Sequence, residues 1–393
     1  MFGQISLDII LLFILYGVGA AAALIACLYL LLHRSNAFAP DVTPPVRLRR
    51  WTAAFFAVMA VGHLWYLPGA VLSSDEAVIM GMLAGGLLDC LLFVPLVIVV
   101  MLCMLQDRRR PLWPAWVLTV PAVVGFLACM ATCSYDYVPM VRVYFLLLGI
   151  GLVVYMVRAV RQYGRWLRDN YADLEHKEVW QTFVVLAVIV LMLVYYVVGD
   201  GSIAYAYIVQ VCGIVLICHL LWRVETLSDL SISGTQENEN TGIQEGEGED
   251  LPSDNAELPA NAELPDTLSD DAYEKMTLLL QKHCIDTGLY LQHDLNKAQV
   301  AQAIGTNRTY LSLYFMRQET TYNAYINDLR IRHFIRLYRE AIAAERPVTA
   351  QQLALMSGYR SYSTFSLAFK QRMDQSVTAW MRREKIEAGE GGN

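Results

Sequence analysis

The stretch "VTAQQLALMSGYRSYSTFSLAF", residues 348–369, decides the fold of the carboxyl-terminal part of this chain. An earlier stretch, "LNKAQVAQAIGTNRTYLSLYF" at residues 295–315, repeats its plan. Each places an alanine (Ala354 or Ala301) four residues before a glycine (Gly358 or Gly305), and an amphipathic segment with aromatic residues follows. The glycine allows a tight turn between two helices, and the alanine lets the helices cross closely. The repeated plan predicts a tandem helix-turn-helix.

Apolar residues at helical spacing supply an inner face for each unit. They are Val300, Ile304, Leu311 and Phe315 in the first unit, and Leu353, Phe365 and Phe369 in the second. Between the units, residues 322–344 predict one connecting helix, about 34 Å long at 1.5 Å per residue. A connector of that length sets two recognition helices about one turn of duplex apart, in successive major grooves.

Residues 289–383 resemble the DNA-binding domain of AraC/XylS-type bacterial transcription regulators. The second unit carries the most specific part of the likeness, at Leu353, Ala354, Gly358, Tyr359, Ser363, Phe365, Phe369 and Lys370. "YINDLRI", residues 325–331, resembles the connector helix of that family. The likeness covers about a quarter of the chain. It implies double-stranded DNA as the partner and transcription regulation as the function.

Eight residues are expected to meet DNA, most of them at the ends of the two recognition helices. They are Asn307, Arg308 and Thr309 in the first unit, and Arg360, Ser361, Tyr362, Ser363 and Lys370 in the second. Two of them have a plainer alternative. Asn307 fits a helix cap equally well, and Tyr362 fits a surface aromatic.

The chain departs from the family pattern at several positions. A common Gly-x-x-Phe after the first unit corresponds to residues 320–323 here, and a Gly-x-x-Pro after the second corresponds to "DQSVT", residues 374–378. Leu313 and Leu367 occupy places where an arginine often projects from the recognition helix. Because arginine makes the commonest bidentate contact with guanine, sequence readout is expected to be weaker or to use other side chains.

The amino-terminal half has a different character. Hydrophobic residues make up 56% of the 393 residues, and they concentrate before Arg223. Seven apolar stretches meet or approach the roughly 20 residues that a membrane-crossing helix needs: residues 7–32, 51–72, 77–105, 112–133, 138–160, 179–199 and 203–222. The chain is therefore predicted to be all-α, with a seven-helix transmembrane bundle (1–223), a disordered acidic linker (224–266) and the tandem helix-turn-helix domain (267–388).

Charge predicts how the chain is oriented. The first, third and fifth connections between the stretches hold twelve Arg and Lys residues, whereas the connections at residues 73–76, 134–137 and 199–202 hold none. The positive-inside rule then predicts that the amino terminus lies outside and the carboxyl-terminal domain lies in the cytoplasm. Together with these spans, the resemblance to bacterial regulators implies a multi-pass protein of the bacterial inner membrane. Residues 158–180 mix cations with aromatics and are expected to lie as a helix on the inner surface, for anchoring more than for signalling.

The formal net charge of −7 averages two opposite segments. Residues 224–274 hold fifteen acidic residues and no Lys or Arg, and "NAELP" occurs there twice. Such a segment buries too little apolar surface to fold, so a flexible tether is predicted. Residues 289–386 hold fourteen Lys and Arg against seven Asp and Glu, a balance that suits a polyanionic partner.

Asp89 is the best candidate for an intramembrane sensing residue, because it lies in "GGLLDCLLF" without a neighbouring charge. The alternative is an interhelical hydrogen bond that only holds the bundle together. Cys129 and Cys133 share a helix face and fit either redox sensing or small apolar packing. The sequence contains no catalytic, nucleotide-binding or zinc motif, so we expect no enzyme activity, no metal and no cofactor.

Two functions fit these observations. The favoured one is a membrane-anchored, one-component transcription regulator that responds to an unknown signal in the membrane or envelope, with a homodimer left open. The alternative is a membrane transporter or structural membrane protein with a degenerate helix-turn-helix tail that binds a protein partner.

Overall fold

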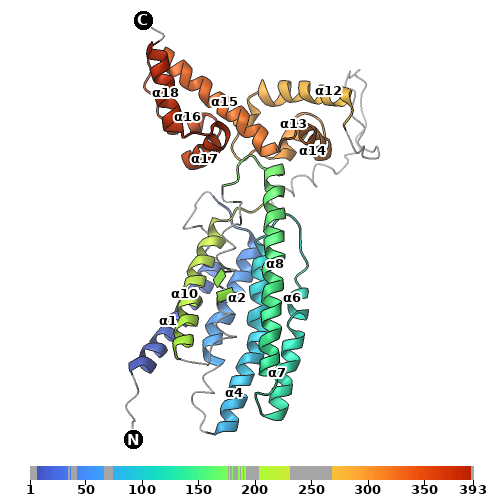
Figure 1. The fold of residues 1–393 in the computed structure, drawn as a ribbon, viewed down its shortest axis with the longest axis vertical. Helices are drawn as coiled ribbons and strands as arrows, with labels where there is room; N and C mark the ends of the chain where they lie inside the picture. Colours follow the sequence, from blue (N-terminus) through green and yellow to red (C-terminus); the bar gives the residue numbers. More distant parts are fainter. Residues whose placement is uncertain are drawn as a thin grey trace. The chain divides into compact units, whose positions relative to one another are not determined.

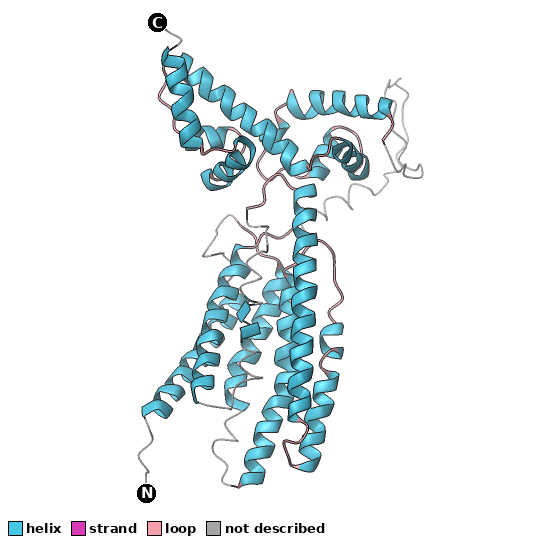
Figure 2. Ribbon diagram, in the orientation of Figure 1, coloured by secondary structure: helices cyan, strands magenta, loops and turns pink. Residues whose placement is uncertain are grey.

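The computed structural model describes residues 7–33, 36, 42–65, 74–175, 177, 179, 185, 187–188, 190–191, 203–230 and 268–390. Within these ranges the chain is helical and forms no strand (Figures 1 and 2), and one isolated antiparallel bridge joins Tyr171 to Asn296. The prediction of an all-α protein is confirmed for this part of the chain. The predicted linker lies almost wholly outside the described residues.

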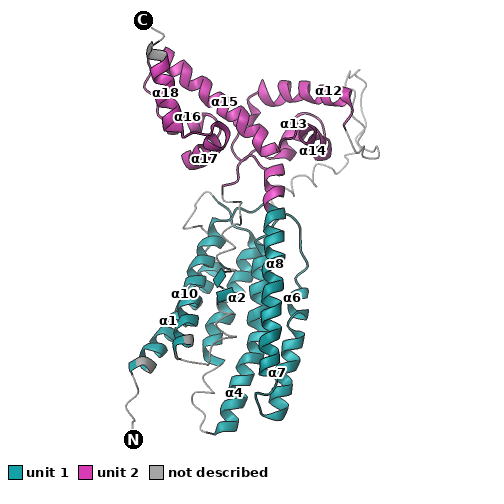
Figure 3. Cartoon of the chain, viewed as in Figure 1, with its two compact units in different colours: residues 1–163, 176–244 teal, residues 164–175, 245–393 magenta. Residues whose placement is uncertain are grey.

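The chain divides into two compact units (Figure 3). Unit 1 contains Met1–Tyr163 and His176–Gln244, and unit 2 contains Gly164–Glu175 and Glu245–Asn393. A short piece from the middle of the sequence therefore belongs with the carboxyl-terminal domain. The boundary at residue 164 lies inside one helix.

Unit 1 is built from long apolar helices. They are α1 (Leu7–Leu32), α2 (Val46–Trp65), α4 (Asp75–Leu88), the π-helix η1 (Asp89–Phe93), α5 (Val94–Cys103), α6 (Pro114–Val117), α7 (Val120–Thr132), the first part of α8 (Val138–Asn170) and α10 (Ile203–Thr226). Glycines let neighbouring helices approach closely. A Cβ on Gly86 of α4 would meet the ring of Phe126 on α7 at 2.5 Å, and one on Gly125 would meet Val141 of α8 at 2.4 Å.

Five stretches of the described helices are long and apolar enough to cross a membrane: Ile10–Leu32, Asp75–Cys103, Pro114–Thr132, Val138–Asn170 and Ala206–Thr226. They coincide with five of the seven predicted spans. The helix α2 falls short because its first turn carries three arginines and the described part ends at Trp65. The predicted sixth span, residues 179–199, lies mostly outside the described residues.

Unit 1 extends beyond the predicted boundary at residue 223. The helix α10 continues to Thr226, and residues 224, 227 and 230 are buried. The side chain of Gln106 then holds the following loop, because its Nε2 donates to Ser228 O at 2.9 Å and its Oε1 accepts from Leu230 N at 2.9 Å. Buried apolar residues therefore continue past the end of α10, where composition alone suggested a linker.

The described carboxyl-terminal part of unit 2 begins at Leu268. Its helices are α12 (Asp270–Leu280), the π-helix η2 (Gln281–Ile285), the 3-10 helix η3 (Leu289–Leu291), α13 (Lys297–Ala303), α14 (Arg308–Arg317), α15 (Tyr322–Ala343), α16 (Ala350–Met356), α17 (Tyr362–Met373) and α18 (Val377–Glu390). We call α13 with α14 the first helix pair and α16 with α17 the second helix pair. Side-chain oxygens of Asn296 and Thr349 cap the first helix of each pair in matching capping boxes.

The two pairs turn in the same way. Gly305 and Gly358 have φ of 69° and 88°, the left-handed region that glycine adopts without strain. The amide after each glycine donates five residues back, from Thr306 to Ala301 O at 2.8 Å and from Tyr359 to Ala354 O at 3.2 Å. Both turns are therefore Schellman motifs. The predicted roles of the glycines are confirmed by their dihedral angles.

The helix α15 joins two separate cores. Tyr322 and Ile326 in its first half pack into the core of the first helix pair, and Phe334 and Tyr338 in its second half pack into the core of the second pair with Trp380. The predicted connector at residues 322–344 agrees with the observed bounds to one residue. Its 22 residues give a length of about 33 Å.

One acidic residue after each helix pair has a positive φ angle. Glu319, not residue 320, has a positive φ of 52°, and Asp374 has a φ of 52° after the second pair. These two residues adopt the left-handed conformation that a glycine would favour.

The helix α8 does not end where the apolar stretch ends. It was expected to span residues 138–160 and to be followed by a helix on the membrane surface, but it runs to Asn170 as one helix. Residues after Gly164 belong to unit 2, and Ala172 is buried in the core of the first helix pair. Residues 171–175 belong to unit 2 because of the polar contacts that they make there, described below.

Candidate nucleic-acid interface and a cavity among the apolar helices

The first predicted contact site surrounds the start of α14. Asn307 caps this helix, and its Oδ1 accepts hydrogen bonds from Thr309 N at 3.0 Å and Tyr310 N at 2.9 Å. Asn307 is therefore the helix cap that the sequence offered as the alternative to a DNA contact, and its carboxamide oxygen already has hydrogen-bond partners within the chain. Asn307, Arg308 and Thr309 are exposed together on one turn.

The second predicted site surrounds the start of α17. Ser361 caps this helix by accepting from Thr364 N at 3.3 Å. Arg360 is exposed and pairs with Asp294, with 2.9 Å between Nη2 and Oδ2. The ring of Tyr362 is half-buried and lies 6.0 Å from that of Phe365, so this residue is partly a core residue. Ser363 and Lys370 are exposed.

The two leucines at expected arginine positions differ from each other. Leu313 is partly buried against the core of the first helix pair. Leu367 is 60% exposed on α17, and Met316 on α14 is 63% exposed. The side chains that these two helices expose are therefore partly apolar. Apolar side chains contact the thymine methyl group in the major groove.

Sequence reasoning missed two cations of unit 2. Lys297 is only 6% exposed, and its Nζ donates to Ser312 Oγ at 2.7 Å. Burial lowers the pKa of Lys297, the nearby Asp169 carboxylate raises it, and Arg308 lowers it further. Arg330 is fully buried beneath Tyr359, with its guanidinium carbon 5.4 Å from the ring centre. Arg330 lies in the "YINDLRI" motif quoted above, so this motif was the feature of the sequence that could have pointed to it.

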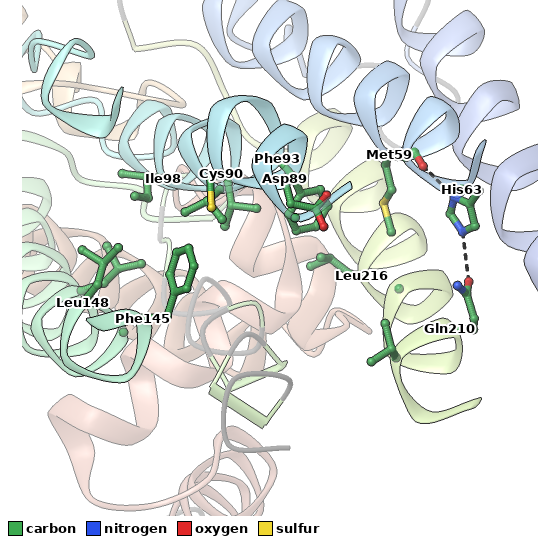
Figure 4. Close-up of a pocket in the computed structure, with 18 of the residues that line it drawn as sticks. Met59, His63, Asp89, Cys90, Phe93, Ile98, Phe145, Leu148, Gln210 and Leu216 are labelled. Carbon is green, nitrogen blue, oxygen red and sulfur yellow. Dashed lines mark hydrogen bonds between the residues drawn. The ribbon is translucent and has the colours of Figure 1, made fainter. Parts of the chain in front are cut away.

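The described helices of unit 1 line a partly open cavity of about 390 Å³ (Figure 4). Most of its lining is apolar or aromatic, and Asp89 is among the lining residues. Asp89 stands at the point where α4 passes into the π-helix η1. Short π-helical turns inside α-helices are frequent at functional sites. The structure thus places the predicted sensing residue at the wall of a cavity.

A second polar group lines the same cavity. His63 Nε2 lies 3.0 Å from Gln210 Oε1, and His63 Nδ1 lies 2.6 Å from Met59 O, as the dashed lines in Figure 4 show. The ring of Tyr16 meets that of His63 edge to face at 5.5 Å. The sequence offered Gln210 as a signal, since it is a polar residue inside an apolar run.

Metal ligands do not gather in the described residues, where no group of three or more His, Cys, Asp or Glu side chains could hold an ion. All eight cysteines are free thiols. Cys129 is buried in a core cluster with Leu83 and Phe126, whereas Cys133 ends α7 in a left-handed conformation. Cys129 therefore fits the role of a small apolar core residue, which the sequence offered as the alternative to redox sensing.

No protein-family model, curated protein or solved structure matches this chain.

Proposed function

We propose that the protein is a membrane-anchored, one-component transcription regulator that binds double-stranded DNA through its two helix pairs. Each pair acts as a helix-turn-helix unit, α14 and α17 enter successive major grooves, and unit 1 responds to a signal in the membrane or envelope. The observation that carries the proposal is the repetition of one turn geometry, glycine and hydrogen bonds included, in two pairs that a single helix joins.

Charge and length add support. Residues 289–386 have an excess of seven positive charges. A connector of about 33 Å matches the rise of one turn of duplex, about 34–36 Å. In this arrangement Arg308 and Lys370 neutralise phosphates, and Ser361, Tyr362 and Ser363 lie where bases are read. The apolar helices of unit 1 support a position in a bilayer. In this proposal the positive-inside rule puts unit 2 in the cytoplasm.

The test is a binding titration of the purified full-length protein with duplexes selected from a random pool. Arg308→Gln and Lys370→Gln should each weaken binding to selected and random duplexes alike and reduce the salt dependence by about one unit. Changes at Ser361, Tyr362 or Ser363 should alter which sequences are selected. Arg382→Gln, an exposed cation of α18 outside both pairs, is the matched control.

The alternative function is a membrane transporter or structural membrane protein whose tail binds a protein. The cavity that contains Asp89 is the observation that favours it. If neither the parent protein nor any variant binds duplex DNA in a salt-dependent way, while Asp89→Asn abolishes a transport activity, this second function is preferred.

A further inference from the structure

Unit 2 holds a strand-like piece of backbone that comes from elsewhere in the sequence. The amide of Ala172 donates to Leu295 O at 3.0 Å. Two asparagines one turn apart on α15 bind the carbonyl groups of the same backbone piece. Asn323 Nδ2 donates to Tyr171 O at 3.1 Å and to Ala172 O at 2.6 Å, and Asn327 Nδ2 donates to Ala172 O at 3.3 Å. Backbone groups of residues 171–172 are thus bound as a peptide would be.

The next side chain of this piece completes a buried ion pair. Asp173 Oδ1 lies 2.8 Å from Arg330 Nη1, with the two side chains 3% and 0% exposed. Arg330 also donates to Tyr290 O at 2.8 Å and Gln292 O at 2.7 Å, and Asp173 Oδ2 accepts from Asp294 N at 3.0 Å. Without Asp173, the buried guanidinium would lose its only carboxylate partner among the described residues, which is a costly state.

The last side chain of the piece reaches the helix proposed to read DNA. Glu175 Oε2 accepts from Ser361 Oγ at 2.7 Å and from Thr364 Oγ1 at 2.5 Å. These hydroxyls lie at the cap and first turn of α17, where the helix dipole favours an anion. DNA bound at α17 would need the same end of the helix, because Ser361 is among the residues proposed to read bases. Arg360 beside them is already paired with Asp294.

We propose that Gly164–Glu175 is an internal competitor of DNA, which docks on unit 2 and blocks the amino-terminal end of α17 with the carboxylate of Glu175. The inference rests on the proposed function, since it needs α17 to meet DNA. In the docked state the exposed turn at residues 307–309 stays accessible while the second pair is occluded. The protein then binds DNA through one pair only, and release of the segment adds the second.

The segment begins inside a helix that it shares with unit 1. Residues 164–170 form the end of α8, the same helix whose earlier residues belong to a candidate membrane span. The chain therefore offers a covalent path from this span to the segment. Asp169 adds a third carboxylate near Lys297, a residue of the first helix pair. Three acidic side chains of one short segment thus face groups of the proposed DNA-binding domain.

The other role for this segment is a permanent strut that aligns the two pairs. It contacts Leu295, two residues before the first helix pair, and Thr364 in the second helix pair. The two roles predict opposite effects. Removal of the Glu175 charge strengthens DNA binding if the segment competes, and leaves it unchanged or weakens it if the segment only aligns.

The first measurement is fluorescence anisotropy of a random-sequence duplex of about 30 base pairs with the full-length protein in lipid nanodiscs. Glu175→Gln should bind about fivefold more tightly than the parent, because apparent affinity rises with the fraction of protein in the competent state. Glu274→Gln, an exposed carboxylate on α12, makes the same change of charge away from the segment and should bind as the parent does.

The second measurement locks the segment in place. Glu175→Cys combined with Thr364→Cys should form a disulfide on oxidation, and the oxidised protein should bind the same duplex at least about tenfold more weakly than its reduced form. If the disulfide forms and the oxidised protein binds equally well or better, or if Glu175→Gln binds no more tightly than the parent, the competitor role is overturned and the proposed function stands. If neither reduced nor charge-neutralised protein shows salt-dependent binding, the proposed function itself falls.

Discussion

Gly305 and Gly358 occupy the same turn position, but their surroundings differ. A Cβ on Gly305 would meet nothing within 4 Å, whereas one on Gly358 would lie 2.7 Å from Leu291 O and 2.8 Å from Leu291 Cα. Leu291 precedes Gln292, whose carbonyl accepts from Arg330. The turn of the second pair is therefore tied to the buried ion pair, and the turn of the first pair is open.

This difference predicts unequal effects of two alanine substitutions. Gly305→Ala should lower the free energy of unfolding of unit 2 by about 1–2 kcal/mol, the cost of a left-handed non-glycine residue. Gly358→Ala should cost more than that, because the backbone of Leu291 must also move. Pulse proteolysis of the full-length protein in urea measures both. Equal losses for the two variants would show that the close approach at Leu291 is not maintained.

His333 gives unit 2 a dependence on pH. Its Nδ1 lies 3.1 Å from Tyr290 Oη, and burial together with Arg336 lowers its pKa below the ordinary value, while Glu340 raises it. Because the folded state favours neutral His333, the unfolded state binds the proton first as the pH falls. Stability is therefore retained above about pH 6.5 and declines as the pH falls from there toward the lowered pKa.

The corresponding variant is His333→Gln, which cannot take up a proton. In pulse proteolysis at pH 7.5 and 5.5, the parent should lose more stability between the two values than His333→Gln does. A parent protein that is equally stable at both values, or a variant with the same loss, contradicts the assignment to His333.

At the scale of whole elements, the local sequence predicted the helices and turns well, but it did not predict contacts between segments that are distant in the sequence. The bounds of α15 and both glycine turns were predicted because their determinants lie within a few residues: caps, glycines and a 3.6-residue apolar repeat. The packing of residues 171–175 in unit 2 was not predicted, because the residues that they contact are distant in the sequence. Arg330, for example, lies 157 residues after Asp173. The tryptophans and arginines around them suggested a membrane surface instead.

The candidate sites follow the same division. Asn307 and Ser361 were expected at helix starts, and both cap their helices. Local sequence could not show that Arg360 has a partner in Asp294 or that Leu313 turns inward, because both depend on how the helices pack.

The inward position of Leu313 predicts an asymmetry between α14 and α17. Leu367→Arg should be tolerated, because Leu367 is 60% exposed, and it should add a preference for guanine in duplexes selected by the full-length protein. Leu313→Arg places a charge against the core of the first helix pair and should lower the free energy of unfolding by about 1–3 kcal/mol. Selection from a random pool and pulse proteolysis report the two effects. A destabilising Leu367→Arg with a neutral Leu313→Arg would reverse the assigned orientations.

At the scale of the whole molecule, three covalent connections join the units: residue 164 within α8, the step from residue 175 to residue 176, and the acidic segment after residue 230. Amino-acid composition indicated only the acidic segment. A tail cut at residue 268 therefore lacks Asp173, and its buried Arg330 has no carboxylate.

The consequence is a prediction about truncated proteins. A tail of residues 268–390 joined to a copy of residues 164–175 through a glycine-serine linker should be more stable than the tail alone. The gain should reach about 3–5 kcal/mol at most, the cost of breaking a buried pair. Urea unfolding followed by circular dichroism measures it, and Asp173→Asn in the fused copy should remove most of the gain. Equal stability of tail and fusion would mean that the segment contributes nothing to the folded domain.

The acidic segment and α8 should also differ in what their disruption does to the full-length protein. Deletion of residues 255–265, which contain both "NAELP" copies, shortens a segment predicted to be a flexible coil, and such a coil transmits no rotation. The yield of the disulfide between residues 175 and 364 should then be unchanged. Gly164→Pro should reduce that yield, because proline disrupts the helix that positions the segment. Gly164→Ala is the matched control: its Cβ would meet nothing within 4 Å, and alanine favours the helix. If the deletion abolishes the disulfide while Gly164→Pro leaves it intact, the acidic segment is the ordered connection and α8 is not.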